Sequence, residues 1–315
     1  MRKGIITLLT LALTMLPAEA GERDRKPVEF ADPYIMLHDG TYYLYGTRYK
    51  NGIGVLVSDN LKTWRIPDDG RTRLALDMKD SYGNRWFWAP EVYHIGDKFV
   101  MYYSSDEHIC AAESDSPAGS FVQKAKVPLR SEKGIDNHLF IDSDGKPYIY
   151  WVRFNKGNEI WMAELENDCE TIKAGTERLC TKPDQDWEMN RARVNEGPLV
   201  LKHGGTYYLV YSGSDFRSQD YALGYATASS PYGPWTKYEG NPIFRRPDGL
   251  SGVGHNAMFL DKRGGLMTVF HSHKDSGTVG PRTTHITRVF FRKGEPGKPA
   301  TMHFSPKYRN LEMCR

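Results

Sequence analysis

The feature that most constrains this chain is a short pattern that occurs five times along it. Each copy is a turn containing glycine, followed by a strand in which aromatic and aliphatic side chains alternate, and another short apolar strand precedes the turn. The copies read DGTYYLYGT, GDKFVMYYS, DGKPYIYWV, GGTYYLVYS and GGLMTVFHS, with marker glycines at Gly40, Gly96, Gly145, Gly204 and Gly264. Two apolar strands joined by a glycine turn predict a β-hairpin.

The spacing of the five copies predicts the fold class. The marker glycines lie 56, 49, 59 and 60 residues apart, and a unit of three or four strands that recurs at such an interval is typical of a β-propeller blade. No segment keeps an apolar period of 3.6 residues, so helices should be few and short. We predict an all-β fold, a five-bladed β-propeller that forms a single domain over residues 21–315. A β-sandwich is the alternative, although it requires no common register in five copies.

The first twenty residues have a different character. Arg2 and Lys3 precede an apolar run from Gly4 to Leu16, and residues 18–20 read Ala-Glu-Ala, a small-x-small cleavage pattern. We expect residues 1–20 to be a signal peptide rather than a buried first strand. Because the apolar run is too short to cross a bilayer comfortably, the protein is expected to be secreted or periplasmic, with no membrane anchor.

Charge and cysteine content exclude two classes of function. Lys and Arg number 42 against 39 Asp and Glu, with no basic run, so nucleic acid is not an expected partner. The cysteines, Cys110, Cys169, Cys180 and Cys314, lack the spacing typical of a zinc site. Cys169 and Cys180 are near enough in sequence to close a small loop, but the sequence leaves their pairing open.

Register indicates where the chemistry lies. Counting back eight or nine residues from each marker glycine samples the first strand of every repeat at a similar depth, and the residues found there are Asp32, Trp88, Asp136, Glu196 and His255. The innermost strands of a propeller line its central channel, so we expect these side chains to meet near the axis. Three converging carboxyl groups repel one another and lose hydration, which costs stability unless a site uses them.

Carboxyl groups arranged in this way suit glycoside hydrolysis. An inverting enzyme needs one carboxylate to activate water and one carboxylic acid to protonate the leaving oxygen, about 6.5–9.5 Å apart. A third carboxylate near the acid would raise its pKa and keep it protonated. The Trp88 ring would offer a flat apolar face to a sugar, with core packing as the alternative.

Five segments, taken in order, carry a resemblance to a known family. ADPYIMLHDGTYYLYGT, WAPEVYHIGDKFVMYYS, IDNHLFIDSDGKPYIYWV, NEGPLVLKHGGTYYLVYS and GVGHNAMF resemble the successive blade motifs of glycoside hydrolase family 43, over residues 28–295. The resemblance implies hydrolysis with inversion of an oligo- or polysaccharide, without an organic cofactor. It implies Asp32 as the general base, Asp136 as the residue that modulates pKa, and Glu196 as the general acid.

Further positions follow from the resemblance. His255, in GVGH, matches a family histidine that in many members helps to hold calcium; since calcium prefers oxygen ligands, one Ca²⁺ and a hydrogen-bonded channel histidine both stay open. Arg282, in PRTTHI, resembles the arginine that contacts the sugar hydroxyl beside the anomeric carbon, with a surface turn as the alternative. Apart from the resemblance, Tyr34 and Phe216 are aromatic candidates to line the pocket and bind substrate, with core or inter-blade packing as the alternative. Glu91 lies three residues out of register and is expected to be structural.

The resemblance narrows the substrate to pentosides. Family members act mainly on α-L-arabinofuranosides, β-D-xylosides or arabinan, and long β-xylosidases usually carry an added C-terminal β-sandwich. The sequence ends at Arg315, which favours release of α-L-arabinofuranose from plant hemicellulose or pectin-type glycans. A β-xylosidase or endo-arabinanase of that family and a non-catalytic carbohydrate-binding propeller are the alternatives. Residues 181–193 and 214–220 are expected to form the rim of the site.

Overall fold

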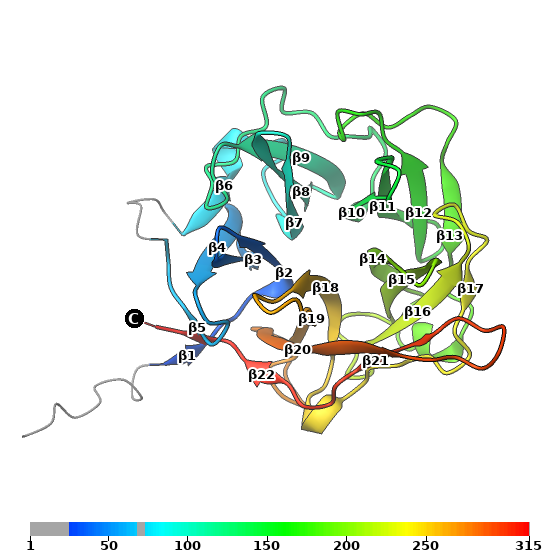
Figure 1. The fold of residues 1–315 in the computed structure, drawn as a ribbon. Coiled ribbons are helices and arrows are strands. Elements are labelled where there is room, and N and C mark those ends of the chain that lie inside the picture. The colour runs from blue at the N-terminus through cyan, green and yellow to red at the C-terminus, as the bar shows by residue number, and fades with distance from the viewer. Residues whose placement is uncertain (1–24, 68–72, 315) are drawn as a thin grey trace, which may run out of the picture.

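The sheets of the molecule stand around one central axis (Figure 1). A computed structural model describes residues 25–67 and 73–314, so the expected signal peptide over residues 1–20 lies outside the described residues. Within them the regular structure is β-strand, apart from three 3-10 helices: η1 (Met78–Asp80), η2 (Asp186–Glu188) and η3 (Pro247–Gly249). None of these helices is long and apolar enough to cross a membrane. The predicted all-β propeller with few, short helices is therefore confirmed.

Five of the sheets begin at the five sequence repeats. The first contains β2 (Ala31–His38), β3 (Thr41–Tyr49), β4 (Gly52–Ser58) and β6 (Leu74–Asp77). The second contains β7 (Trp88–Ile95), β8 (Lys98–Ser105) and β9 (His108–Ser114). The third contains β10 (Ile135–Ile141), β11 (Pro147–Phe154), β12 (Asn158–Glu164) and β13 (Arg178–Thr181).

The remaining two repeats build the second half of the ring. The fourth sheet contains β14 (Asn195–His203), β15 (Thr206–Gly213), β16 (Ala222–Ala228) and β17 (Thr236–Lys237). The fifth contains β18 (Gly254–Leu260), β19 (Leu266–Ser272), β20 (Thr283–Arg292) and β21 (Thr301–Phe304), with β22 (Arg309–Asn310) also paired to β20. In every one of the five sheets the marker glycine occupies the hairpin turn between the first two strands, with φ between 56° and 85°, a conformation that glycine adopts without steric cost.

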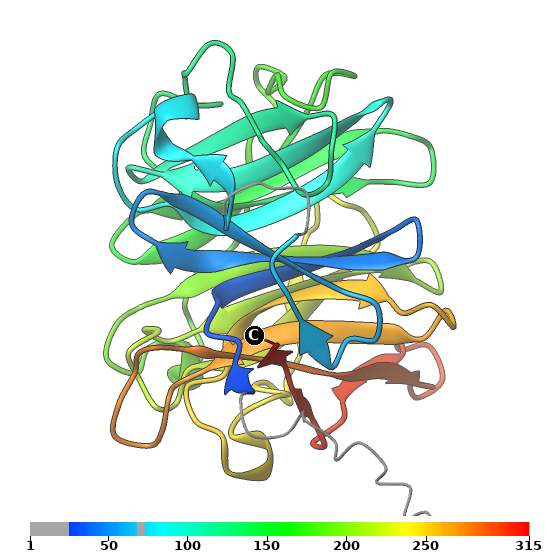
Figure 2. The same ribbon diagram turned by 90° about the vertical axis from the view of Figure 1, so that its left-hand side faces the viewer.

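The number of sheets differs from the expected five, because the described residues form six. The sixth joins β1 (Lys26–Pro27), β23 (Glu312–Met313) and β5 (Thr63–Trp64). β1 and β23 pair antiparallel, so the first and last described strands lie side by side (Figure 2). Strands of two residues carry no apolar alternation, which is why the repeat pattern did not predict this sheet.

The interior is built from the apolar faces of neighbouring sheets. Four clusters of buried side chains fill the spaces between them, and each has a large aromatic member: Trp64, Tyr103, Trp151 and Tyr150. Wide aromatic side chains remove much apolar surface from water in each contact. All four cysteines are free, so the loop between Cys169 and Cys180 is not closed by a disulfide.

The first strand of each repeated sheet is irregular at its inner end. In β2, Ala31 pairs with Thr47 but Tyr34 pairs with Tyr45, and the same register shift occurs in the other four first strands. The second residue of each bulge has a positive φ: Asp32 (48°), Ala89 (49°), Asp136 (58°), Gly197 (56°) and His255 (46°). Trp88 and Glu196 stand one position earlier. The predicted single ring is therefore wrong in detail: its members occupy two adjacent positions.

Candidate active site

The bulges are held by contacts between neighbouring sheets. In four sheets the backbone N–H of the bulge residue donates to a side chain on the second strand of the preceding sheet, as Asp136 N–H does to Ser104 Oγ at 2.9 Å and His255 N–H to Ser212 Oγ at 2.7 Å. Asp32 N–H likewise donates to His271 Nδ1 at 3.1 Å. A residue other than glycine at positive φ costs about 1–3 kcal/mol and persists only when its surroundings fix it. These contacts thus fix the direction of the side chains that face the axis.

The fourth sheet departs from this rule. The equivalent residue on the preceding second strand is Val152, which pairs with Ile135 and has no hydrogen-bond acceptor in its side chain. The free N–H of Gly197 instead donates to Asp136 Oδ2 at 3.1 Å. A carboxylate that accepts a backbone N–H is both oriented and stabilised in its charged form.

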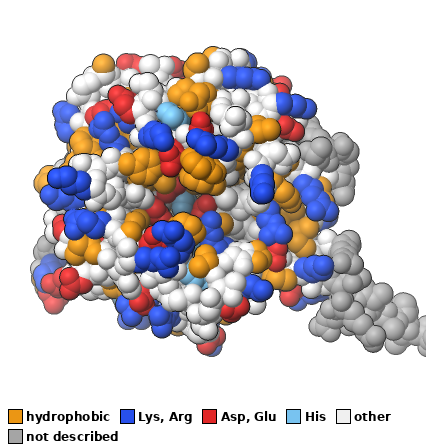
Figure 3. Space-filling model, turned by 180° about the vertical axis from the view of Figure 1, so that it is seen from behind, with side chains coloured by type: hydrophobic (Ala, Val, Ile, Leu, Met, Phe, Trp, Pro, Cys, Tyr) orange, Lys and Arg blue, Asp and Glu red, His pale blue; other side chains and the backbone are white. Residues whose placement is uncertain are grey.

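The side chains predicted from register line one cavity of about 710 Å³ on the axis. Figure 3 shows this face, where acidic and histidine side chains gather in a hollow with hydrophobic and basic side chains around it. Seven of the eight predicted site residues line the cavity: Asp32, Trp88, Asp136, Glu196, Phe216, His255 and Arg282. The predicted rim segments contribute Ala192, Arg193, Asp215 and Arg217.

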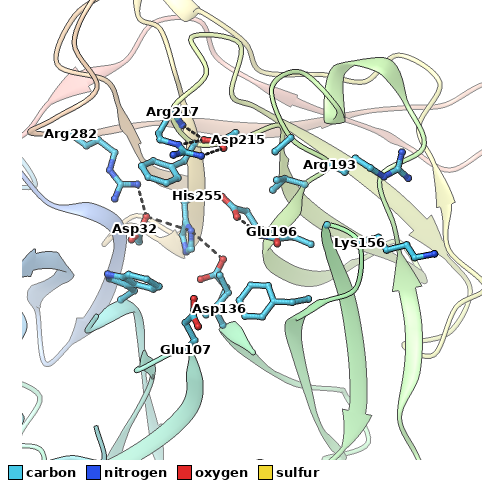
Figure 4. Close-up of a pocket in the computed structure, with 18 residues that line it drawn as sticks. Asp32, Glu107, Asp136, Lys156, Arg193, Glu196, Asp215, Arg217, His255 and Arg282 are labelled. Atoms are coloured by element: carbon cyan, nitrogen blue, oxygen red, sulfur yellow. Dashed lines mark hydrogen bonds and ion pairs between the residues drawn. The ribbon is translucent and has the colours of Figure 1, made fainter. Parts of the chain in front are cut away.

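Asp32 lies among positive and polar groups (Figure 4). Its carboxylate accepts hydrogen bonds from Arg282 at 3.1 Å and from Thr47 Oγ1 at 2.7 Å. Burial alone would raise the pKa of Asp32, but Arg282, His255 and His271 outweigh burial and lower it well below the ordinary value. Asp32 is therefore ionised at neutral pH.

Glu196 has the opposite environment. Burial, helped by the negative charge of Asp32, raises its pKa to about 7, although two hydrogen bonds oppose this rise. Those bonds come from Tyr221 Oη to Oε1 at 2.8 Å and from Asn158 Nδ2 to Oε2 at 3.0 Å. Burial, followed by the charges of Glu196 and Asp32, also raises the pKa of Asp136 well above its usual range. Asp136 and Glu196 can therefore retain a proton between them near neutral pH.

His255 stands between the carboxylates. Its Nδ1 lies 3.6 Å from Asp32 Oδ1 and 3.9 Å from Asp136 Oδ2, and its ring packs on Gly197, where a Cβ would lie 3.1 Å from Nδ1. Burial lowers the pKa of His255, which keeps the ring neutral at pH 7.

This donor set does not fit a calcium ion held by protein side chains. Calcium takes six to eight oxygen ligands, whereas His255 supplies a nitrogen, and hydrogen-bond donors already occupy both Oδ atoms of Asp32 and Oδ2 of Asp136. Across residues 25–67 and 73–314, no three His, Cys, Asp or Glu side chains are grouped as a metal site would require.

Aromatic side chains frame the cavity. Trp88 stacks on Trp86 with ring centroids 5.6 Å apart and planes 18° apart, so one of its faces is covered by protein. Phe216 lies under the Arg282 guanidinium, 5.0 Å from the ring centroid. Both were predicted from the sequence.

Tyr34 was predicted to bind substrate, but the structure places its side chain against the core rather than in the cavity. Its ring packs against Tyr93 at 5.7 Å and joins two apolar clusters, and it does not line the cavity. It lies two residues past the bulge residue, one layer deeper along the axis. Glu91 occupies the equivalent position in the second sheet and contacts His138 Nδ1 at 2.9 Å. Glu91 does not line the cavity either, as expected for a structural residue.

Several residues of the site were missed by sequence reasoning: Thr47, Phe154, Asn158 and Tyr221. Thr47 could have been found, because it is the strand partner of the residue before the bulge, the position that His271 holds in the fifth sheet. Tyr221 lies in an irregular segment outside the repeat, and no pattern indicated it.

Comparisons with known proteins agree with this geometry. The model of the family "Glycosyl hydrolases family 43" matches residues 25–296. A crystal structure named as an endo-1,4-β-xylanase from Bacteroides thetaiotaomicron VPI-5482 shares 40% identity over 93% of this chain and 99% of that one, with a TM-score of 0.85. A thermostable family-43 glycoside hydrolase shares 39% identity over 89% and 94% of the two chains, with a TM-score of 0.78.

A curated relative has a more distant sequence. The extracellular exo-α-(1→5)-L-arabinofuranosidase of Streptomyces avermitilis is 24% identical over 91% of this chain, which spans 65% of the relative's length. Because the family model covers most of the sequence and the carboxyl groups lie in one axial cavity, the chain belongs to glycosyl hydrolases family 43.

Proposed function

We propose that this protein is an inverting glycoside hydrolase that releases pentose, with α-L-arabinofuranose as the first candidate, from plant hemicellulose or pectin-type glycans. One observation carries the proposal: the cavity holds two carboxyl groups whose pKa values are displaced in opposite directions. The pKa of Asp32 is lowered, whereas that of Glu196 is raised to about 7. Groups separated in this way can act as base and acid in the same reaction at one pH.

The reaction follows from these protonation states. Asp32 accepts a proton from a water molecule while the water oxygen attacks the anomeric carbon, and the bond from that carbon to the leaving oxygen breaks. Glu196 donates its proton to that oxygen, so that one water is consumed and no net charge is created. Attack from the face opposite to the leaving group inverts the anomeric configuration. The Gly197 N–H orients the carboxyl group of Asp136. Because the charges of Asp136 and Glu196 repel each other, a negative charge on Asp136, or a proton shared between the two groups, favours the acid form of Glu196.

The other predicted residues have supporting roles. Arg282 orients Asp32 and presents the rest of its guanidinium to a sugar hydroxyl, while Trp88 and Phe216 give the sugar apolar contacts. The neutral His255 ring separates Asp32 from Asp136. The side chains around His255 do not suit a calcium ion held by protein ligands alone, and a mostly hydrated Ca²⁺ beside His255 stays a prediction.

Three further parts of the proposal rest on the sequence and the relatives. The charged n-region and cleavage pattern of residues 1–20, together with the extracellular naming of the Streptomyces avermitilis relative, support export. We propose that five of the six sheets, those that begin at the repeats, act as the blades that carry the site. A xylan or β-xyloside substrate is the second candidate, because the structure sharing 40% identity is named as an endo-1,4-β-xylanase.

Proton NMR during hydrolysis tests the proposal. We expect an arabinofuranoside or a xyloside to be cleaved, with the first-formed sugar in the anomeric configuration opposite to that of the substrate. Asp32→Asn should lose nearly all turnover while its circular dichroism stays that of the wild type. Retention of configuration, or substantial activity in a folded Asp32→Asn variant, would refute the mechanism. Sugar binding without turnover in the wild type would point instead to a binding propeller.

A further inference from the structure

The two ends of the cavity differ in the residues beside each carboxyl group. Trp88, Arg282 and Phe216 accompany Asp32, whereas the hairpin turn between β11 and β12 and residues 192–194 accompany Glu196. Figure 4 shows Lys156 and Arg193 beyond Glu196, on the side away from Asp32 and Arg282.

Contacts tie the hairpin turn directly to Glu196. Phe154 and Asn158 are cross-strand partners at the end of the hairpin, and the Asn158 side chain donates to Glu196 Oε2 at 3.0 Å. The backbone N–H of Asn158 donates to the carbonyl of Arg193 at 3.0 Å. Gly157, at φ +135°, permits this approach, because a Cβ there would lie 2.5 Å from the Arg193 carbonyl oxygen. The turn therefore has a fixed position relative to Glu196.

Phe154 presents an unused aromatic face at this end. It lines the cavity, and the residue is 43% exposed. Phe216, at 40%, is similarly exposed, but the guanidinium groups of Arg282 and Arg217 lie over its ring. Trp88 already stacks on Trp86. Within the described part of the chain, no aromatic or cationic side chain stacks on Phe154. A large apolar ring that faces an open cavity gains free energy when a ligand covers it.

We propose that this end is the leaving-group subsite, and that Phe154 is the platform for a pyranose leaving group such as a xylose unit of a xylan backbone. The inference rests on the proposed function, because the side is assigned from Glu196 as proton donor: the oxygen that receives the proton belongs to the leaving sugar. A pyranose chair with equatorial hydroxyl groups presents C–H groups on its faces, and these pack on an aromatic ring. A puckered furanose offers a smaller flat face.

Two substrates with the same pentosyl group separate this subsite from the rest of the site. A pentosyl fluoride has a single fluorine as leaving group, which is too small to reach Phe154, whereas a pentosyl xylo-oligosaccharide places a xylose ring there. The informative quantity is kcat/KM for the oligosaccharide divided by kcat/KM for the fluoride. We expect Phe154→Ala to lower this ratio about tenfold, which corresponds to about 1.4 kcal/mol. Phe154→Tyr, which keeps the ring, should restore the ratio.

Phe216→Ala is the matched control, since it removes an equally exposed phenylalanine from the Asp32 end. It should lower kcat/KM for both substrates by a similar factor. The wild type should also cleave an arabinosyl xylo-oligosaccharide faster than a linear arabino-oligosaccharide, and Phe154→Ala should reduce this preference. If Phe154→Ala does not fold, Phe154→Leu serves for the same comparisons, because it keeps apolar volume without a planar face.

The outcomes distinguish the two proposals. An unchanged ratio in folded Phe154→Ala, with a wild type that cleaves both substrates, would overturn the subsite and leave the hydrolase function standing. A ratio that falls equally in Phe216→Ala would also overturn it, since the effect would not be specific to one end. A wild type that cleaves neither substrate would overturn the proposed function itself.

Discussion

The hydroxyl of Tyr221 offers a direct test of the protonation state assigned to Glu196. Tyr221 is buried, stacks on His271 at 5.9 Å, and donates to Glu196 Oε1 at 2.8 Å. Burial raises the pKa of Glu196, whereas this hydrogen bond favours the charged carboxylate and lowers it, and with the bond in place the pKa is about 7. Tyr221→Phe removes the donor and leaves the ring. The pKa of Glu196 should therefore rise.

The magnitude follows from the strength of such a bond. A hydrogen bond to a charged group contributes about 1.5–3 kcal/mol, and one pKa unit corresponds to about 1.4 kcal/mol. The protonated acid also accepts part of this bond, so we expect a shift near the lower end, about one unit. Because the active form of Glu196 is the acid, activity should persist to higher pH. The basic limb of kcat/KM should move from near pH 7 to near pH 8.

The assay is the pH dependence of kcat/KM for an oligosaccharide, which reports the pKa values of the free enzyme. Tyr150→Phe is the matched control: Tyr150 is also buried and loses one hydrogen bond, to the carbonyl of Pro231 at 2.8 Å, but it does not line the cavity. It should lower thermal stability and leave the basic limb in place. A basic limb that stays put in Tyr221→Phe, or moves down, would refute the assignment of Glu196 as the acid.

Three further predictions use other groups of the site. Arg282→Gln removes the positive charge that lowers the pKa of Asp32. The acid limb of the kcat/KM profile should therefore move to a higher pH, where it can be measured, and an unmoved limb would contradict this. Because the pKa of Glu196 is raised from 4.5 to about 7 in the folded state, the free energy of unfolding of the wild type should fall by about 3 kcal/mol as the pH rises from below 4.5 to above 7. Glu196→Gln should hence raise the melting temperature more at pH 8 than at pH 5, and an equal change at both would count against a buried acid. Val152→Thr offers the Gly197 N–H a competing acceptor, which should move the basic limb of kcat/KM downward, whereas an unchanged profile would show that the N–H stays with its present acceptor.

Much of this arrangement was predictable because one local pattern is repeated. The glycine turns and their flanking apolar strands predicted the first two strands of all five repeated sheets, and counting from the turns located Asp32, Asp136 and Glu196. Charge and burial then made an acid–base pair the natural interpretation. The sequence did not show that Tyr34, two residues beyond the bulge, packs against the core instead of lining the cavity.

The rest depended on contacts that no repeat encodes. Tyr221 reaches Glu196 from an irregular segment, and Asn158 reaches it from the start of β12, an element that sequence spacing does not relate to the fourth sheet. The sixth sheet joins strands from opposite ends of the chain. Long-range pairing of this kind is fixed by ring closure rather than by local propensity, so a single sequence gives little indication of it.

The bulge explains how a repeated scaffold can hold an acid and a base with different chemistry. Asp32 and Asp136 occupy the left-handed position, where the backbone N–H of Asp32 is taken up by the neighbouring sheet. Glu196 stands one residue earlier, so the left-handed position passes to Gly197, and the absence of an acceptor on Val152 releases the Gly197 N–H to Asp136. A shift of one residue in a single sheet thus accompanies a change of partners: Glu196 accepts hydrogen bonds from Tyr221 and Asn158, whereas Asp32 accepts one from Arg282. The same shift supplies Asp136 with a donor that orients it beside the acid.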